Sequence, residues 1–113
     1  GAVCAAAHEA IGPVRETPAT RALLDQALEE VLAVGRAMGV TWPERAKADV
    51  WARYDALPAD GSTSMARDLM GRRPSEFDAQ TGAVIRLARR HAVPVPVHDV
   101  LYAVLLPAAT PAT

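Results

Sequence analysis

Apolar residues recur at helical spacing through most of this chain, and glycine and proline divide them into short segments. The longest segment begins with Pro18, directly after Thr17, and ends at Gly39, with leucine, valine and alanine side chains three or four positions apart. This spacing places the apolar side chains on one face of an α-helix, and proline is favoured at the first helical position. The pattern predicts that residues 17–39 form the longest helix of the fold.

Shorter segments with the same spacing predict five further helices, each bounded by residues that cap or end helices. Their expected ranges are 1–10, 41–57, 62–71, 75–91 and 99–106. The first is interpreted as the end of a helix that Gly12 and Pro13 stop, and the second starts with Thr41 three residues before Glu44, which is a capping box. Before the last helix, two prolines predict extended backbone over residues 93–97.

The pattern as a whole predicts the fold class. No segment shows the alternation of a β-strand, and the sequence contains no internal repeat and no G-x-G-x-x-G motif. Half of the residues are hydrophobic but only 4% are aromatic, so the helices should approach closely around small side chains. The 113 residues suffice for one domain. We therefore predict an all-α fold, a compact bundle of about six helices over residues 1–106, followed by a disordered tail over residues 107–113.

Charge and cysteine content exclude several classes of function. A formal charge of -1 gives no field that would attract nucleic acid or an anionic membrane, and the opening apolar residues are too few to span a bilayer. Cys4 is the only cysteine, which excludes an internal disulfide and a multi-thiolate metal site, and the three histidines lack the spacing of metal ligands. These features fit the reducing cytoplasm, with no nucleic acid, membrane or metal as partner.

Polar residues crowd the junction between the fourth and fifth predicted helices. Ser64 and Glu76 are twelve positions apart, but Gly71 and Pro74 interrupt the helical pattern, so two short helices can fold back and bring both side chains to one mouth. A serine hydroxyl at a helix start can bind a carboxylate, and a glutamate opposite can bind a hydroxyl or share a proton. The pair suits a small hydroxy or keto acid. The plainer alternative is that residues 62–64 only cap a helix and that Glu76 only occupies the first turn of the next.

The order of residues in this region resembles the motifs of a known family. It runs from Ser64-Met65-Ala66-Arg67-Asp68-Leu69 through Gly71-Arg72-Arg73-Pro74-Ser75-Glu76-Phe77-Asp78 to Gly82, His91, Pro94 and Pro96. This order is similar to the pattern S-M-x-x-D, R-x-[ST]-E-[IFL]-D, G, P of ketopantoate (2-dehydropantoate 2-) reductases. The likeness extends over essentially the whole chain, because residues 18–39 resemble the long helix of that family and Leu101-Tyr102-Ala103 its closing helix.

The resemblance implies the helical half of a two-domain oxidoreductase, similar to the C-terminal domain of 6-phosphogluconate dehydrogenase-like reductases. An N-terminal Rossmann domain, absent from this chain, would bind NADPH. The helical domain would bind ketopantoate or a related 2-keto acid for reduction to the 2-hydroxy acid, and would carry the contacts of a homodimer. By the same resemblance, Ser64 would bind the substrate carboxylate, and Glu76 would contact both substrate and cofactor.

The chain departs from that family in the residues that handle protons. The family's general acid is a lysine in a K-x-x-x-N-x-x-x-N helix, but the only lysine here is Lys47 and the chain contains no asparagine. Gly1 would align near the second asparagine, so the lysine is expected upstream of a chain that resembles a fragment, and no catalytic residue is expected within it. Thr81 also replaces a frequent asparagine before Gly82. We expect the fragment alone to be inactive.

Two alternatives remain open at the level of sequence. The chain could be a free-standing helical binding module that has lost redox chemistry, for which the missing lysine and asparagines would be true losses. A basic patch could bind a cofactor phosphate, although its acidic neighbours favour a solvated surface; it would consist of Arg72, Arg73, Arg86, Arg89 and Arg90. Cys4, which has no evident base beside it, is interpreted as a small buried hydrophobe rather than a nucleophile.

Overall fold

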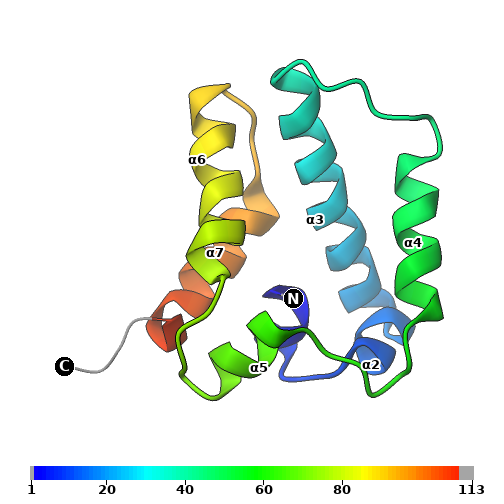
Figure 1. Ribbon diagram of the computed structural model, residues 1–113, viewed down its shortest axis with the longest axis vertical. Helices are drawn as coiled ribbons and strands as arrows, with labels where there is room; N and C mark the ends of the chain where they lie inside the picture. The colour runs from blue at the N-terminus through cyan, green and yellow to red at the C-terminus, as the bar shows by residue number, and fades with distance from the viewer. Residues whose placement is uncertain (1, 110–113) are drawn as a thin grey trace.

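The computed structural model describes residues 2–109, and all regular elements in that range are helical (Figure 1). The α-helices are α1 (Ala2–Ala7), α2 (Ile11–Glu16), α3 (Pro18–Ala37), α4 (Ala46–Ala56), α5 (Ser64–Met70), α6 (Ala83–Arg90) and α7 (Pro96–Ala109). A π-helical turn, η1 (Asp78–Gly82), leads directly into α6. The predicted all-α fold is confirmed, with seven α-helices in the described range where about six were expected.

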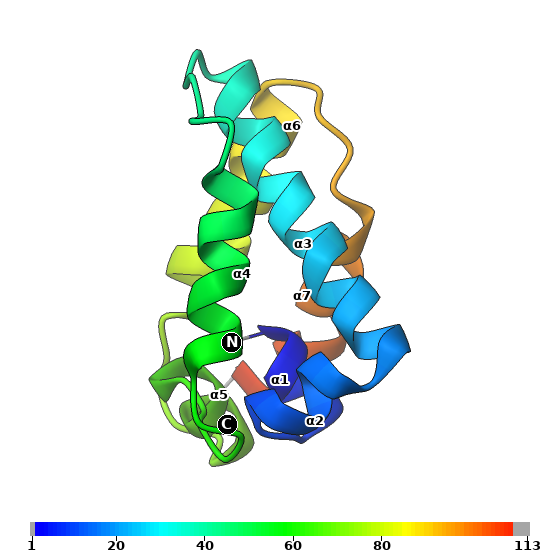
Figure 2. The ribbon, with the colours of Figure 1, turned by 90° about the vertical axis from the view of Figure 1, so that its right-hand side faces the viewer.

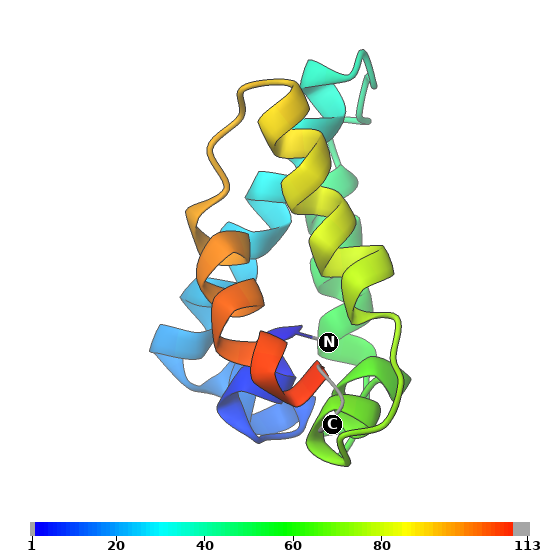
Figure 3. The same ribbon diagram turned by 90° about the vertical axis from the view of Figure 1, so that its left-hand side faces the viewer.

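The helices form two groups that are joined at one end. Helices α3 and α4 lie side by side, α6 and α7 lie opposite α3, and α1, α2 and α5 close the lower end (Figures 1 and 2). Figure 3 shows the segment after α6 descending from the upper end of that helix to α7, which runs on towards the lower end of the molecule, where α1 and α5 lie. The main core lies at this lower end, around Phe77, which is 1% exposed. A smaller cluster, which includes Val34 and Ile85, joins the upper parts of α3 and α6. No helix within residues 2–109 combines the length and apolar character needed to cross a bilayer.

The start of α2 corrects the prediction that Gly12 and Pro13 only end a helix. Helix α1 ends earlier, before His8, whose φ of 56° is left-handed. Gly12 and Pro13 instead lie in the first turn of α2, where proline is tolerated because its missing N–H would have no intrahelical partner. The N–H of Gly12 donates to the carbonyl of Ala59 at 2.8 Å, and a side chain at this glycine would collide with Ala59. A tertiary contact therefore fixes a helix that local signals did not indicate.

The start of α4 corrects a second prediction. The helix begins at Ala46 rather than after Thr41, and no capping box forms. Trp42 explains the difference, because its indole packs on Gly35 of α3 and its Nε1–H donates to the carbonyl of Leu32 at 2.9 Å. This contact uses residues that the capping pattern would have placed in the helix.

Substituting Gly35 with alanine tests this packing. Alanine in place of glycine inside a helix normally stabilises a protein by about 1 kcal/mol. Here the added Cβ would lie 2.5 Å from Cζ2 of Trp42, so we expect the free energy of unfolding to fall by about 1–3 kcal/mol, measured by urea denaturation with far-UV circular dichroism. In a Trp42→Leu background, the same substitution should become neutral or stabilising. An increase in stability without that second change would contradict the contact.

The last helix is longer than expected at both ends. Residues 93–95 lie outside any helix, but Pro96 is the first residue of α7 and Val97 is helical, because proline suits the first helical position. The helix also continues through Pro107 to Ala109, so the tail predicted from residue 107 was wrong for its first three residues. Residues 110–113 of that tail lie outside the described residues.

Candidate functional site

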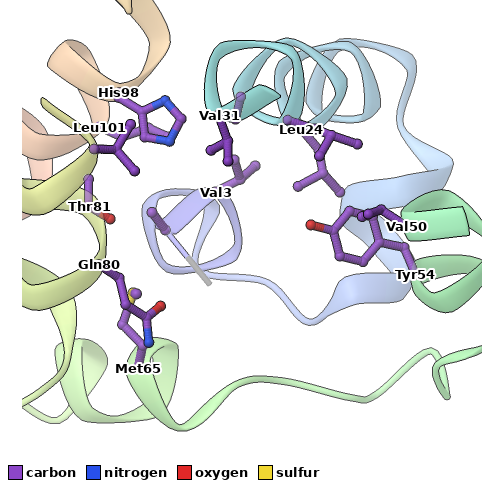
Figure 4. Close-up of a pocket in the computed structure, with 14 residues that line it drawn as sticks. Val3, Leu24, Val31, Val50, Tyr54, Met65, Gln80, Thr81, His98 and Leu101 are labelled. Carbon is purple, nitrogen blue, oxygen red and sulfur yellow. The ribbon is translucent and has the colours of Figure 1, made fainter. Parts of the chain in front are cut away.

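A cavity of about 340 Å3 lies at the centre of the molecule, between α3 and α4 on one side and η1, α6 and α7 on the other (Figure 4). The first residues of α1 and Met65 of α5 complete its lining. Most lining side chains are apolar, among them Leu24 and Val31 of α3 and Leu101 of α7. Six helices and the π turn therefore surround an apolar space large enough for a small ligand.

The polar side chains of the cavity gather mainly on one wall. Gln80 and Thr81 reach it from η1, and His98 reaches it from α7. Tyr54 of α4 lies on the opposite wall, where burial, with a smaller contribution from Cys4, raises the pKa of its phenol. The phenol is therefore a neutral hydrogen-bonding group. π-helical turns such as η1 are frequent at functional sites in proteins.

Ser64 is the first residue of α5, but it is not the residue that caps this helix. The hydroxyl of Thr63 accepts the N–H of Ala66 at 3.1 Å, so Thr63 caps the helix. Ser64 is exposed, and its hydroxyl has no hydrogen-bond partner within residues 2–109. Of the residues 62–64 that the plainer alternative assigned to capping, Thr63 forms the cap and Ser64 does not.

Glu76 precedes η1 and is likewise left free. Ser75 accepts the N–H of Phe77 at 3.2 Å, while the exposed carboxylate of Glu76 forms no hydrogen bond or ion pair in the described part of the chain. The backbone carbonyl of Glu76 accepts the N–H of Gln80 at 2.8 Å, so the two residues are one turn apart.

The structure brings the segments of both candidate residues to the same cavity. Met65, which follows Ser64, and Gln80, one turn after Glu76, both line the cavity (Figure 4). The side chains of Ser64 and Glu76 themselves are not part of that lining.

A buried pair, Glu30 and His98, was not predicted as part of the site. Glu30 of α3 is 3% exposed, and its Oε1 accepts both the backbone N–H of His98 at 3.0 Å and the ring Nδ1–H at 2.7 Å. Its Oε2 accepts the N–H of Val97 at 2.9 Å, so the carboxylate of one helix caps another. The sequence contains one signal for this pair. Val95 precedes a helix that starts at Pro96, and it has no side-chain acceptor with which to cap that helix.

Neither Lys47 nor Cys4 has the environment of a catalytic group. Lys47 of α4 binds Glu29 and Asp25 of α3 at 3.0 Å each, and these hydrogen bonds raise its pKa, which keeps the ammonium group charged. Burial raises the pKa of the Cys4 thiol, and its 5% exposure confirms the interpretation as a buried hydrophobe. No group of three potential metal ligands occurs among residues 2–109.

Comparisons with known proteins agree with this architecture. Residues 1–108 match the family described as ketopantoate reductase PanE/ApbA C terminal. The chain is 35% identical over 88 residues to a 2-dehydropantoate 2-reductase of Mycobacterium tuberculosis, covering 78% of this chain and 30% of that protein. It is 30% identical over 97 residues to a 2-dehydropantoate 2-reductase of Vibrio cholerae, covering 86% and 33% respectively.

Two solved structures share the fold over nearly the whole chain. A dimeric ketopantoate reductase from Staphylococcus aureus superposes with a TM-score of 0.87 at 26% identity, over 96% of this chain and 38% of that one. A PanE/ApbA family ketopantoate reductase from Ralstonia eutropha gives 0.86 at 28% identity, over 96% and 36%. The chain thus spans between 30% and 38% of the length of these relatives. It belongs to the ketopantoate reductase family and corresponds to the C-terminal domain of its members.

Proposed function

We propose that this chain is the substrate-binding domain of an NADPH-dependent 2-dehydropantoate 2-reductase. Its part in the reaction is to hold a small 2-keto acid while the carbonyl group is reduced to a hydroxyl. The observation that carries this proposal is that Ser64 and Glu76 are exposed and without side-chain partners in residues 2–109, and that Met65 and Gln80, one residue and one turn after them, line the same cavity. The relatives named 2-dehydropantoate 2-reductase support the substrate class.

Ser64 and Glu76 each have a proposed role that suits the chemistry of the side chain. The Ser64 hydroxyl donates a hydrogen bond to the substrate carboxylate, and the Glu76 carboxylate accepts one from a hydroxyl of the bound acid or of the cofactor. Two fixed contacts orient the carbonyl group and reduce the entropy lost in reaching the transition state.

The cofactor would be bound mainly outside this chain. The range 2–109 contains helices only, so it does not provide the strand, glycine-rich turn and helix that hold a dinucleotide. NADPH, when bound by a further domain, supplies a hydride, and Glu76 is the contact to it that we assign to this chain. Because Lys47 is held by two carboxylates, the proton comes from outside this chain as well. The 113-residue chain is thus inactive alone, and the complete reductase is this domain joined to a nucleotide-binding domain.

The complete reductase is proposed to be a cytoplasmic homodimer. Helix α7 presents Val100 and Val104, which are 61% and 58% exposed, and an apolar stripe of this kind suits a contact with a second copy. The dimeric relative from Staphylococcus aureus supports this arrangement. A single buried cysteine is compatible with a reducing compartment.

Removal of the Ser64 hydroxyl tests its role in binding. In the complete reductase, Ser64→Ala is expected to raise the KM for 2-dehydropantoate about tenfold with little change in kcat, because a charge-assisted hydrogen bond made equally in the ground and transition states is lost. Steady-state kinetics measure this. The matched control is Ser62→Ala, since Ser62 already accepts a hydrogen bond from Arg67 at 2.9 Å. Equal KM values for both variants would remove Ser64 from the site.

A helical binding module without redox chemistry is the alternative, and in it the missing asparagines and catalytic lysine would be true losses. The upstream gene sequence and an activity assay distinguish the two functions. A reading frame that continues upstream into a G-x-G-x-x-G segment, with a product that oxidises NADPH when 2-dehydropantoate is added, supports the reductase. A start codon next to Gly1 supports the module.

A further inference from the structure

Asp78 is the first residue of the π-helical turn η1, and its carboxylate joins this turn to two helices. Oδ1 of Asp78 accepts a hydrogen bond from the guanidinium of Arg86 in α6 at 3.1 Å. It also accepts one from the hydroxyl of Tyr102 in α7 at 3.2 Å. The guanidinium of Arg86 donates a further bond, at 3.1 Å, to the backbone carbonyl of Asp78. The start of η1 is therefore held by both α6 and α7.

Gly82, the last residue of η1, leaves the space that these contacts need. The carboxylate of Asp78 lies over Gly82, where an added Cβ would collide with Oδ1 of Asp78 and would lie 3.0 Å from the guanidinium of Arg86. Any larger residue at this position would displace the carboxylate from the arginine. The sequence thus places an aspartate, a glycine and an arginine at intervals of four residues, and the three act as one unit.

The π-helical turn determines the direction of the residues that precede it. It forms the lower end of the helix that continues as α6 (Figure 3). The N–H of Ala83 donates to the carbonyl of Asp78, five residues earlier, so this turn contains one residue more than an α-helical turn. Each residue of an α-helix rotates the chain by about 100°. If η1 changed to α-helical bonding, Glu76 would rotate by about that angle relative to α6.

The contacts of Asp78 oppose this rotation. Phe77 lies between Glu76 and Asp78, and its buried ring stacks on Tyr102 with the ring centroids 5.1 Å apart. Tyr102 therefore binds the ring of one residue and the carboxylate of the next, while Arg86 binds the same carboxylate from the other end of the turn. Because Asp78 and Arg86 are both largely exposed, their ion pair adds little to the stability of the fold. Its main effect is on the geometry of one turn.

We propose that Asp78 and Arg86 are positioning residues of the reductase, and that with Tyr102 they keep η1 in the π-helical form that directs Glu76 towards substrate and cofactor. This inference rests on the proposed function, in which Glu76 makes those contacts. Neither Asp78 nor Arg86 touches the reacting groups, and both act through the direction of the Glu76 side chain. A misplacement of about 1 Å in such a contact can lower a rate up to ~100-fold, so a change in this turn lowers kcat in a folded protein.

The test is a double-mutant cycle in the complete reductase with 2-dehydropantoate and NADPH. Arg86→Met keeps the aliphatic part of the side chain and removes the guanidinium. It is expected to lower kcat at least ~5-fold in the otherwise wild-type enzyme but less than ~2-fold in a Glu76→Ala background, where the positioned group is already gone. The Tm should change by less than about 2 °C, because the lost ion pair is exposed. The matched control is Arg53→Met, which removes an exposed arginine of α4 without a side-chain partner in residues 2–109 and should leave kcat unchanged.

Two variants of Asp78 show whether the hydrogen bonds to Oδ1 are the cause. Asp78→Asn keeps an oxygen that accepts from both Arg86 and Tyr102, so it should retain at least about half of the wild-type kcat. Asp78→Ala removes this oxygen and should lower kcat at least ~5-fold, as Arg86→Met does. Equal losses for Asp78→Asn and Asp78→Ala would assign the effect to the charge and overturn the positioning role.

The remaining outcomes separate this inference from the proposed function. If Glu76→Ala lowers kcat/KM but Arg86→Met has the same effect with and without that change, the positioning role is overturned and the role of Glu76 stands. A rise in the KM for NADPH that persists in the Glu76→Ala background would assign Arg86 to a cofactor phosphate and also overturns the inference. If Glu76→Ala leaves kcat/KM unchanged, the proposed role of Glu76 is wrong, and this inference is wrong with it.

Discussion

Replacing Glu76 with alanine in the complete reductase is expected to lower kcat/KM for 2-dehydropantoate at least ~100-fold. The carboxylate is exposed and forms no hydrogen bond or ion pair within residues 2–109, which is what the proposed contact to substrate and cofactor requires. If the Glu76 contact strengthens in the transition state, as the carbonyl oxygen gains a proton and becomes a hydrogen-bond donor, its loss lowers kcat. A contact made equally in the ground state would raise only KM when it is lost. Steady-state kinetics therefore show whether Glu76 differs in role from Ser64.

Two further variants make the Glu76 result specific. Glu76→Gln keeps the size and one acceptor oxygen but removes the charge, and a loss as large as that of alanine would assign the effect to the charge. Glu44→Ala changes an exposed glutamate in the loop before α4 and should leave kcat/KM unchanged. If Glu76→Ala also leaves kcat/KM unchanged, Glu76 does not belong to the site.

The elements that could be predicted from the sequence are those fixed by local interactions. Helix α3 begins at Pro18 and α5 is capped by Thr63, and both features follow from residues within one turn of the helix start. The start of α2 and the late start of α4 could not be predicted, because Ala59 and Gly35 respectively determine them through contacts distant in sequence. Local propensity is decisive only where no tertiary contact competes with it.

The residues of the candidate site also fall into those that could be predicted from the sequence and those that could not. Ser64 and Glu76 were identified because they belong to one short motif whose order resembles a family. The pairing of Glu30 with His98 spans 68 positions, and Glu30 stands in an ordinary amphipathic segment directly after Glu29. Nothing in that spacing indicates which of the two glutamates is buried, since the difference depends on the angle at which α7 meets α3.

The largest effect on stability is expected for Glu30. Its carboxylate accepts three hydrogen bonds, from the backbone N–H groups of Val97 and His98 and from the His98 ring, and it is 3% exposed. Glu30→Ala leaves these three donors buried without an acceptor and opens a cavity beneath α7. We expect the free energy of unfolding of the 113-residue chain to fall by about 3 kcal/mol or more, measured by urea denaturation with far-UV circular dichroism.

A variant of the neighbouring glutamate and a double variant show whether the loss of stability comes from removing the buried carboxylate that accepts all three hydrogen bonds. Glu29→Ala removes a half-exposed partner of Lys47 and should cost less than about 1 kcal/mol. In the Glu30→Leu/His98→Leu protein the ring donor is gone and an apolar side chain fills the space, so part of the loss should be recovered, although the N–H groups of α7 remain without a cap. Equal losses for Glu29→Ala and Glu30→Ala would show that the carboxylate of Glu30 does not hold α7 against α3. The start of α7, which carries His98, would then need another support, because few other polar contacts within residues 2–109 fix the N-terminus of this helix.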